Sequence, residues 1–230
     1  MNKDITKKQN KFYSDLLKEK GFGVDAVASK HQTYKELRYD KLSQVFRNDN
    51  NSFSLHDVGF GLGHYYEFLK KKCHNNRSFT YSGSEVTTRF VEESAKLYPE
   101  CNFICRDIAE QPYDDHYDYL IFAGTFYHLI DTTEKDFTKY IEALLTNAFI
   151  MCDRGLAFNF ITSYVEYKKP GLFYGDIQEI INFIVKKLSR FFTIDHSYPL
   201  YEYTICVYKE DYIHTLHPDE LYEKYFKCIT

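Results

Sequence analysis

One glycine-rich stretch, from Ser54 to His64, holds the residues whose types and spacing predict ligand binding. Its letters read SLHDVGFGLGH, and the YYEFLK that follows is typical of the start of a helix. Gly59 and Gly61 can adopt backbone angles that other residues avoid, which lets a ligand approach the main chain closely. A strand, a glycine turn and a helix N-terminus together predict a nucleotide-type cradle, because free N–H groups and a positive dipole end would face the ligand.

The glycine spacing separates two kinds of nucleotide site. A dinucleotide-binding turn reads G-x-G-x-x-G, whereas this chain reads G-x-G-x-G and has His64 at the sixth position. Asp57 lies two positions before the first glycine, and the resulting D-x-G-x-G-x-G resembles motif I of the class I S-adenosylmethionine (SAM) methyltransferases. The resemblance implies that the glycines make room for the amino-acid part and the sugar of SAM. A tight turn between a strand and a helix is the simpler alternative.

Composition limits the classes of function. The 230 residues fit one domain, and the net charge of −4 gives no overall attraction to nucleic acid or to an anionic membrane. Neither an apolar leader segment nor a run of membrane-spanning length is visible. The six cysteines form no C-x-x-C pair, so we expect reduced thiols, no metal site and a cytoplasmic protein.

The elements that must position the glycine turn follow a strand–helix alternation. We expect N-terminal helices over 10–20, ending at Gly21, and over about 30–46. The first 50 residues could form a lid over the cofactor mouth or simply pack on the sheet edge. Residues 53–210 would form the core and 211–230 a loosely packed, amphipathic tail.

Within the core, apolar runs predict the remaining strands and helices. A Tyr-Pro-Leu-Tyr turn predicts that the last two strands pair antiparallel. The fold class is therefore α/β: a doubly wound, mostly parallel, seven-stranded Rossmann-like sheet with a terminal antiparallel hairpin and N-terminal helices. Strands are expected over 78–84, 102–106, 117–124, 155–161, 190–196 and 203–209, and the strand over 155–161 could begin earlier, at 149–152. Helices are expected over 87–97, 134–146 and 176–188.

Acidic residues follow two of the predicted strands. Glu85 ends the second strand, 22 residues after Gly63, where a carboxylate can accept hydrogen bonds from a ribose diol. Asp107 follows the third strand and can accept from an adenine amino group, and Ile108 can lie against the adenine face. A helix-capping carboxylate and a surface aspartate are the alternatives.

Taken together, residues 10–210 resemble the class I SAM-dependent methyltransferases in the order of strands, the three acids and the terminal hairpin. The resemblance implies SAM as cofactor, S-adenosylhomocysteine (SAH) as product and a small-molecule acceptor. Arg38 would bind the cofactor carboxylate, or else form a surface ion pair on its helix. The other residues that it implies for the cofactor are Asp57, Gly59, Gly61 and Gly63 at the methionine end, the backbone of Ala123 at its amino group, Glu85 and Val86 at the ribose, and Asp107 and Ile108 at the adenine.

A narrower resemblance concerns a bacterial subgroup associated with surface-polysaccharide (capsule and O-antigen) biosynthesis. It implies O-methylation of a sugar hydroxyl or of a phosphoryl or phosphoramidate oxygen. The stretches that carry it are the Gln32–Arg38 helix, GLAFNF from Gly155, GLFY from Gly171 and HSYPLYEYT from His196.

The acceptor side is expected at the carboxyl ends of the fourth and fifth strands. A neutral alcohol acceptor must lose its proton, and a histidine suits that role. We take His128 as the candidate base and Tyr127, Asn159 and Tyr164 as substrate-binding residues, with His64 as another candidate. An anionic phosphoryl acceptor would need no base.

Other classes of function remain open at this stage. A NAD-type oxidoreductase shares the fold but has a different glycine spacing. A non-catalytic SAM-binding protein would keep the same acids. Nucleic-acid methylation is disfavoured because neither an Asn-Pro-Pro-Tyr nor a Pro-Cys motif follows the fourth strand.

Overall fold

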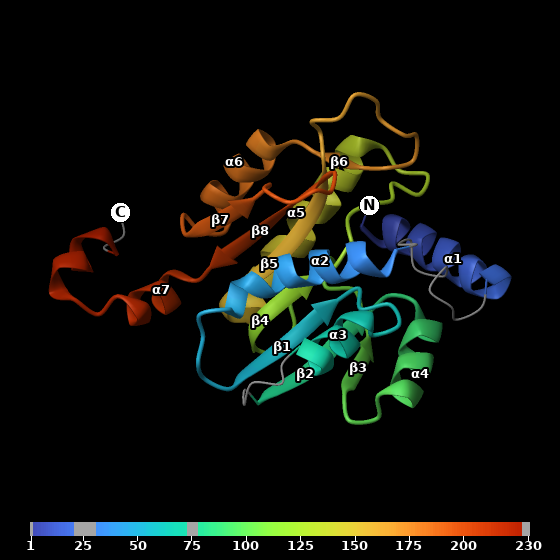
Figure 1. Cartoon of the computed structure of the whole chain (residues 1–230). Helices are drawn as coiled ribbons and strands as arrows, with labels where there is room; N and C mark the ends of the chain where they lie inside the picture. Colours follow the sequence, from blue (N-terminus) through green and yellow to red (C-terminus); the bar gives the residue numbers. More distant parts are fainter. Residues whose placement is uncertain (1, 21–30, 73–77, 227–230) are drawn as a thin grey trace.

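The computed structural model describes residues 2–20, 31–72 and 78–226 of the chain (Figure 1). The predicted helix boundaries at Gly21 and Lys30 lie outside the described residues. Two of the six cysteines, Cys73 and Cys228, also lie outside them, as does the end of the predicted tail.

A twisted open sheet forms the centre of the molecule, with the strand order β3-β2-β1-β4-β5-β8-β7. The first five strands of this order run parallel, and β8 pairs antiparallel with both β5 and β7. This confirms the doubly wound Rossmann-like sheet and its antiparallel hairpin. The strands are β1 (Phe53–Val58), β2 (Phe79–Glu85), β3 (Asn102–Cys105), β4 (Tyr117–Phe122), β5 (Cys152–Thr162), β6 (Tyr174–Gly175), β7 (Phe192–Asp195) and β8 (Glu202–Tyr208).

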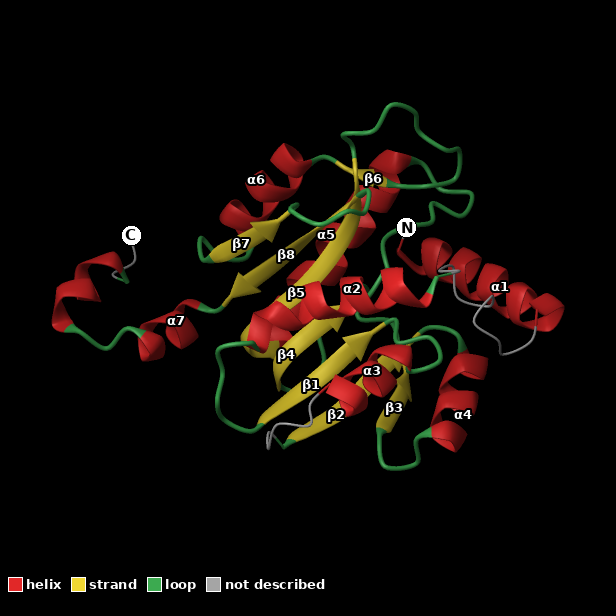
Figure 2. Cartoon of the chain, in the orientation of Figure 1, coloured by secondary structure: helices red, strands yellow, loops and turns green. Residues whose placement is uncertain are grey.

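Helices cover both faces of the sheet because the central strands are apolar on both sides. In β4, Tyr119 and Ile121 face one layer while Leu120 and Phe122 face the other, and all four are fully buried. Figure 2 shows α2 crossing in front of the sheet and α5 behind it. The helices are α1 (Asn2–Lys20), α2 (Gln32–Leu42) with the 3₁₀ turn η2 (Ser43–Phe46), α3 (His64–Lys72), α4 (Thr88–Leu97), α5 (Glu134–Met151), α6 (Ile177–Lys187), α7 (Glu210–Leu216) and the 3₁₀ turn η3 (Glu220–Tyr225).

The largest differences from the sequence-based expectation concern α5, α1 and β6. Helix α5 continues to Met151, so residues 149–151 do not begin a strand. Ala148 and Met151 extend the buried stripe of this helix at helical spacing. Helix α1 begins at Asn2 instead of near residue 10, and it buries Ile5 against the main core. The two-residue strand β6 adds an eighth strand, where the sequence predicts a loop.

The C-terminal segment projects from the end of β8 away from the sheet (Figure 1). Neither α7 nor η3 has a buried residue. Among the described residues, no helix is long and apolar enough to cross a membrane.

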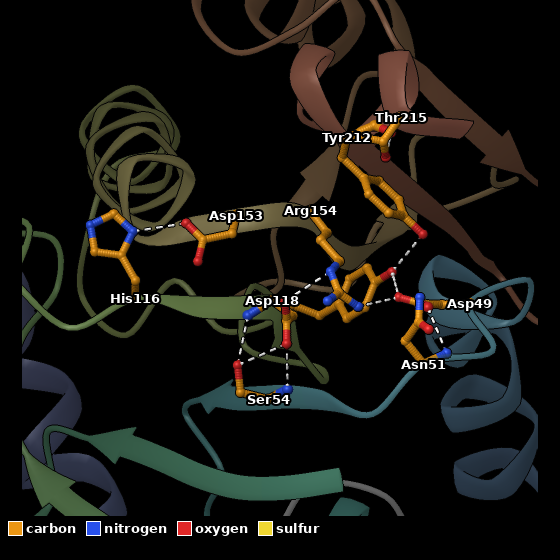
Figure 3. A network of polar contacts seen from close by, with 10 residues as sticks. Asp49, Asn51, Ser54, His116, Asp118, Asp153, Arg154, Tyr212 and Thr215 are labelled. Carbon is orange, nitrogen blue, oxygen red and sulfur yellow. Dashed lines mark hydrogen bonds and ion pairs between the residues drawn. The ribbon is translucent and has the colours of Figure 1, made fainter. Parts of the chain in front are cut away.

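Buried and half-buried polar residues link the strands at the edge where β1 and β4 begin (Figure 3). The Arg154 guanidinium lies 2.5 Å from Asp49 and 2.8 Å from Asp118. The Ser54 backbone N–H donates to Asp118, and the Tyr119 hydroxyl donates to Asp49. We call these five residues the amino-edge network. It fixes the start of β1, β4 and β5 relative to one another.

Candidate functional site

The order in which the chain adds strands to the sheet reverses between the parallel neighbours β1 and β4. Strands β2 and β3 lie on one side of β1, and β4 and β5 lie on the other. Ligands in open α/β sheets bind at such a switch point, outside the carboxyl ends of the strands. The segments that follow β1 and β4 are the glycine turn and the loop of residues 123–131.

The glycine turn uses backbone angles that require glycine. Gly59, Gly61 and Gly63 have φ values of +79°, +58° and +72°. A Cβ atom on Gly59 would lie 3.1 Å from the Thr125 side chain, and one on Gly63 would lie 2.7 Å from the Tyr98 ring. Gly59 and Gly61 line a cavity, whereas Gly63 packs against Tyr98 outside it.

The cavity lies at the switch point under α1 and α2. Its empty volume, including the part open to solvent, is about 1160 Å³. Helix α1 contributes Gln9 and Tyr13 to the wall, and α2 contributes Lys35, Arg38 and Tyr39. Of the residues predicted from the sequence, those that line the cavity are Arg38, Asp57, Gly59, Gly61, His64, Glu85, Val86, Asp107, Ile108, Ala123, Tyr127 and His128.

Asp57, at the end of β1, has one carboxylate oxygen in use and one available. Its Oδ2 accepts a 2.6 Å hydrogen bond from the Tyr81 hydroxyl, while Oδ1 has no partner among the described residues. The side chain is buried, and this burial raises the pKa of Asp57 to about 7, with a smaller contribution from nearby Glu85. An acceptor without a donor in a buried wall fits a ligand that brings a cationic N–H group.

Glu85 is held at the mouth of the glycine turn by backbone groups. Its Oε1 accepts from the N–H groups of Val86 and Thr87 at 2.8 and 3.2 Å, and its Oε2 accepts from Gly61 at 3.3 Å. A carboxylate has about four acceptor sites, so one remains for a ligand hydroxyl. Burial raises the pKa of Glu85, and the three N–H groups counteract that rise.

Asp107, after β3, contacts α1. It accepts hydrogen bonds from the Thr6 hydroxyl and from the Ala109 N–H. Helix α1 also reaches the end of β2, where the Asn10 amide donates to the Val86 carbonyl at 2.9 Å. Helix α1 therefore lies across the carboxyl edge of the sheet, at one end of the cavity.

Arg38 lies at the other end of the cavity, where a carboxylate of the protein already binds it. Its Nε and Nη2 donate to the two oxygens of Glu202 at 2.8 and 2.5 Å. Glu202 also accepts from the Tyr127 hydroxyl at 2.7 Å and from the Asn159 amide at 3.0 Å. We call these four residues the carboxyl-edge network. The partner of Arg38 is thus on β8, not on its own helix.

Two predicted substrate-binding residues do not line the cavity. Asn159 is fully buried behind it, where its Oδ1 accepts from the Gly124 N–H at 3.0 Å. It supports the loop after β4 instead of facing a ligand. Tyr164 is 68% exposed and lies beside His196, away from the cavity.

His128 lies on a loop with unusual backbone geometry. Ile130 and Asp131 have φ values of +42° and +53°, which side chains rarely allow. The loop is held by backbone bonds from Leu129 N–H to Gly171 and from Phe173 N–H to Tyr127. Strained loops of this kind concentrate at functional sites.

Burial keeps the imidazoles of the cavity neutral. It lowers the pKa of His128, and it lowers that of His64 to about 4, with a contribution from the positive charge of Lys35. A neutral imidazole can accept a proton. His128 therefore has the protonation state that a general base needs.

Several residues of the site were missed in the sequence. Glu202 lies within the HSYPLYEYT stretch, and a single acid inside the otherwise apolar YEYTICV run was a usable signal. Lys35 is one helical turn from Arg38, but helical spacing alone did not show that α2 faces a cavity. Gln9 and Tyr13 belong to the part of α1 whose role the sequence left open.

An observation independent of any likeness shows that the cavity suits a polar ligand, as SAM is. Among the described residues, six buried side-chain polar atoms have no hydrogen-bond partner, and three of them, Asp57 Oδ1, Ser84 Oγ and Arg106 Nε, belong to residues that line the cavity. Buried polar groups are normally satisfied, so these three mark places where a polar ligand would add bonds. The described residues hold no group of three or more His, Cys, Asp or Glu side chains arranged for a metal ion.

Comparisons with known proteins point to the same fold. No protein-family model matches the chain. The chain is 28% identical over 167 residues to a protein of Mycobacterium tuberculosis (strain ATCC 25618 / H37Rv) named "Putative methyltransferase Rv1506c", an alignment that covers 70% of this chain and 96% of that protein.

Solved structures resemble the whole architecture. The DhpI–SAH complex has a TM-score of 0.63 at 14% identity and covers 89% of this chain and 97% of its own. The N-methyltransferase NodS from Bradyrhizobium japonicum WM9 with SAH gives 0.62 at 14% identity, covering 85% and 96%. Magnesium protoporphyrin IX methyltransferase (ChlM) from Synechocystis PCC 6803 with SAH gives 0.62 at 13% identity, covering 90% and 99%. The chain therefore has the Rossmann-like fold of these methyltransferases.

Proposed function

We propose that this chain is an enzyme, a SAM-dependent methyltransferase that acts on a small molecule. The observation that carries the proposal is the convergence of Asp57, Glu85 and Asp107 from three successive strand ends on one cavity beside the glycine turn. A dinucleotide site would need only the acid after β2 and a different glycine spacing. Structural neighbours crystallised with SAM or SAH support the choice of cofactor.

Each end of the cavity would hold a different part of the cofactor. The free Oδ1 of Asp57 and the backbone of Ala123 would accept from the amino group, close to Gly59 and Gly61. Glu85 would accept from the ribose. Residues that would surround the ribose edge and the adenine are Val86, Asp107 and Ile108, with Gly63 shaping the turn from outside the cavity.

The bound cofactor would supply a methyl group already activated by its sulfonium. What remains for the protein is to hold the acceptor behind that methyl group and to exclude water. His128 would take the proton of a hydroxyl acceptor at a ring nitrogen, since its lowered pKa keeps it neutral near pH 7. Tyr127 lines the same wall, and Asn159 supports the loop behind it.

For the acceptor, we propose an oxygen atom of a sugar hydroxyl or of a phosphoryl or phosphoramidate group in bacterial surface-polysaccharide biosynthesis. The support is that two of the stretches resembling that subgroup surround the His128 loop. The GLFY stretch bonds to the loop at Gly171 and Phe173, and the HSYPLYEYT stretch supplies Glu202 to Tyr127. These stretches therefore shape the side of the cavity where an acceptor would enter.

Methyl transfer from labelled SAM tests this proposal. The purified protein is incubated with SAM and with panels of sugars, nucleotide-linked sugars and phosphorylated metabolites, and SAH formation is measured with and without NAD. We expect acceptor-dependent SAH formation that NAD does not inhibit. Binding of SAM without transfer to any acceptor would favour a non-catalytic SAM-binding protein, and binding of NAD instead of SAM would favour an oxidoreductase.

A further inference from the structure

One peptide group after β4 is held by a hydrogen bond that comes from behind the cavity. Asn159, on β5, is fully buried there, and its Oδ1 accepts from the Gly124 N–H at 3.0 Å. The peptide that joins Ala123 to Gly124 is trans, so its carbonyl and its N–H point in opposite directions. Because the N–H points to Asn159, the Ala123 carbonyl points away from Asn159, toward the side on which Ala123 lines the cavity.

The orientation of the Asn159 amide is set by a carboxylate. A rotation of this amide by half a turn would place its nitrogen, which only donates, against the Gly124 N–H. In the structure Nδ2 donates to Glu202 Oε2 at 3.0 Å and to the Tyr127 hydroxyl. An ionised carboxylate only accepts hydrogen bonds, so it can face the nitrogen of the amide but not the oxygen. Glu202 therefore excludes the reversed orientation and leaves Oδ1 for Gly124.

Glu202 is itself fixed by donors from two other elements. Arg38 of α2 meets both of its oxygens in the bidentate geometry that guanidinium and carboxylate groups prefer, and the Tyr127 hydroxyl donates to it at 2.7 Å. The ring of Tyr127 also packs on Gly124, where a Cβ atom would lie 3.2 Å from it. Gly124 has a φ of +77°, a conformation that favours glycine. The peptide after β4 is therefore held through Glu202 on two sides.

We propose that Glu202 and Asn159 are positioning residues that turn the Ala123 carbonyl into the cavity, where it accepts from the amino group of the cofactor. Neither of the two lines the cavity, so they act through the peptide between Ala123 and Gly124. The carbonyl joins Asp57 Oδ1, which has no partner among the described residues, as a second acceptor for the same amino group. This inference rests on the proposed SAM-binding function and names the residues that prepare one of its contacts.

A ligand that lacks only the amino group isolates this contact. Isothermal titration calorimetry compares SAH with deaminated SAH, in which a hydrogen replaces the amino group, on the wild type, Asn159→Leu and Glu202→Leu. Leucine has the branching of asparagine but cannot accept from the Gly124 N–H. We expect Asn159→Leu to weaken SAH binding by about fivefold or more and binding of the deaminated analogue by less than about twofold. Glu202→Leu should cause a selective loss in the same direction, because the reversed amide of Asn159 is then allowed.

The matched control is Asp195→Leu, because Asp195 also binds a cation of α2. Lys41 Nζ lies 2.7 Å from its Oδ2, and its other side-chain hydrogen bonds among the described residues come from Gln44 and Ser197, not from the loop after β4. Both ligands should bind this variant as they bind the wild type. The ratio of the two dissociation constants is the quantity that decides, because a general loss of stability affects both ligands alike.

An unchanged ratio in Asn159→Leu and Glu202→Leu, or a wild type that binds the two ligands equally, would overturn the proposal. If Glu202→Leu does not fold, the double variant Arg38→Met, Glu202→Leu takes its place, because it leaves neither partner of the buried pair without its countercharge. If Asn159→Leu does not fold, Asn159→Ala removes the same acceptor. Failure of the wild type to bind SAH would refute the proposed function itself, a result distinct from the failure of this assignment.

Discussion

The two edges of the sheet each pair an arginine with carboxylates, but they differ in which buried polar atoms lack a hydrogen-bond partner. At the amino edge, Arg154 compensates Asp49 and Asp118 (Figure 3), and no buried side-chain atom of that network lacks a hydrogen-bond partner among the described residues. At the carboxyl edge, Arg38 and Glu202 are also paired, yet beside them Asp57 keeps a buried oxygen with no donor.

The difference distinguishes charged groups that hold elements of this fold together from charged groups that a ligand could satisfy. A satisfied ion pair fixes elements relative to one another and needs nothing from a ligand. A buried acceptor without a donor has a free-energy cost in the empty protein that a ligand can remove. On the proposed function, the carboxyl edge therefore combines a frame of paired charges with groups that would bind the cofactor, while the amino edge has only the frame.

The largest expected effect concerns the candidate base. His128→Gln should lower the turnover number for a hydroxyl acceptor by about 10²- to 10⁴-fold, because general base catalysis typically contributes that much. The SAH dissociation constant should change little, since the loss concerns proton transfer. Steady-state kinetics beside calorimetry measures both quantities. Tyr164→Phe, far from the cavity, is the control, and equal losses in the two variants would contradict the role of His128.

At the amino edge, the expected effect is on stability alone. Arg154→Met leaves the buried Asp49 and the half-buried Asp118 without their countercharge, and it should lower the free energy of unfolding by about 1–3 kcal/mol. Urea denaturation measures the change. Below the unfolding range the affinity for SAH should equal that of the wild type. A loss of SAH affinity in folded Arg154→Met would contradict the claim that the amino edge affects stability alone.

A substitution at Asp57 should have the opposite effects, raising stability at high pH and weakening SAH binding. Its pKa is about 7 in the fold and near 4 in the unfolded chain, so ionisation destabilises the empty protein as the pH rises from about 4 to 7. Asp57→Asn removes this penalty and should raise the free energy of unfolding at pH 8 by about 1–4 kcal/mol, while weakening SAH binding. Urea denaturation at pH 5 and pH 8 with calorimetry tests both. A variant that is less stable at pH 8 and binds SAH normally would refute this assignment.

The smallest expected effect concerns Asp176, a helix-capping residue outside the cavity, whose loss should change stability but not ligand binding. Asp176 caps α6 by accepting from the N–H groups of Gln178 and Glu179 at 2.9 and 3.0 Å, and it does not line the cavity. Asp176→Ala should cost about 1 kcal/mol of stability, as loss of a helix cap does, without changing SAH affinity. Thermal unfolding with and without SAH checks this. If SAH stabilises Asp176→Ala less than it stabilises the wild type, the cap of α6 affects ligand binding and the prediction is wrong.

Local patterns in the sequence predicted most of the fold. The alternation of strands and helices, the hairpin at the end and the left-handed glycine turn all depend on residues near one another in the chain. The length of α5 was underestimated because the apolar residues 149–151 fit a strand as well as a helix, and only the burial of Met151 on the same face as Leu144 distinguishes the two.

The site was predicted less completely, for a physical reason. Glu202 pairs with Arg38 across 164 positions, and no local pattern specifies such a contact. Tyr164 follows β5, as an acceptor-side residue should, but the loop turns its side chain outward. Residues at strand ends could be placed from topology alone, whereas residues on long loops and on covering helices depend on tertiary packing.

Calorimetric titration with SAH of the wild type, Glu85→Ala and Asp153→Ala tests the central claim most directly, since each variant removes one carboxylate from one edge of the sheet. Glu85 lines the cavity, whereas Asp153 is exposed at the amino edge, where it lies 2.9 Å from His116. We expect the wild type and Asp153→Ala to bind SAH equally and Glu85→Ala to bind it about tenfold more weakly or worse. Folded wild-type protein that does not bind SAH, or Glu85→Ala that binds it as well as Asp153→Ala does, would contradict the assignment of this cavity to SAM.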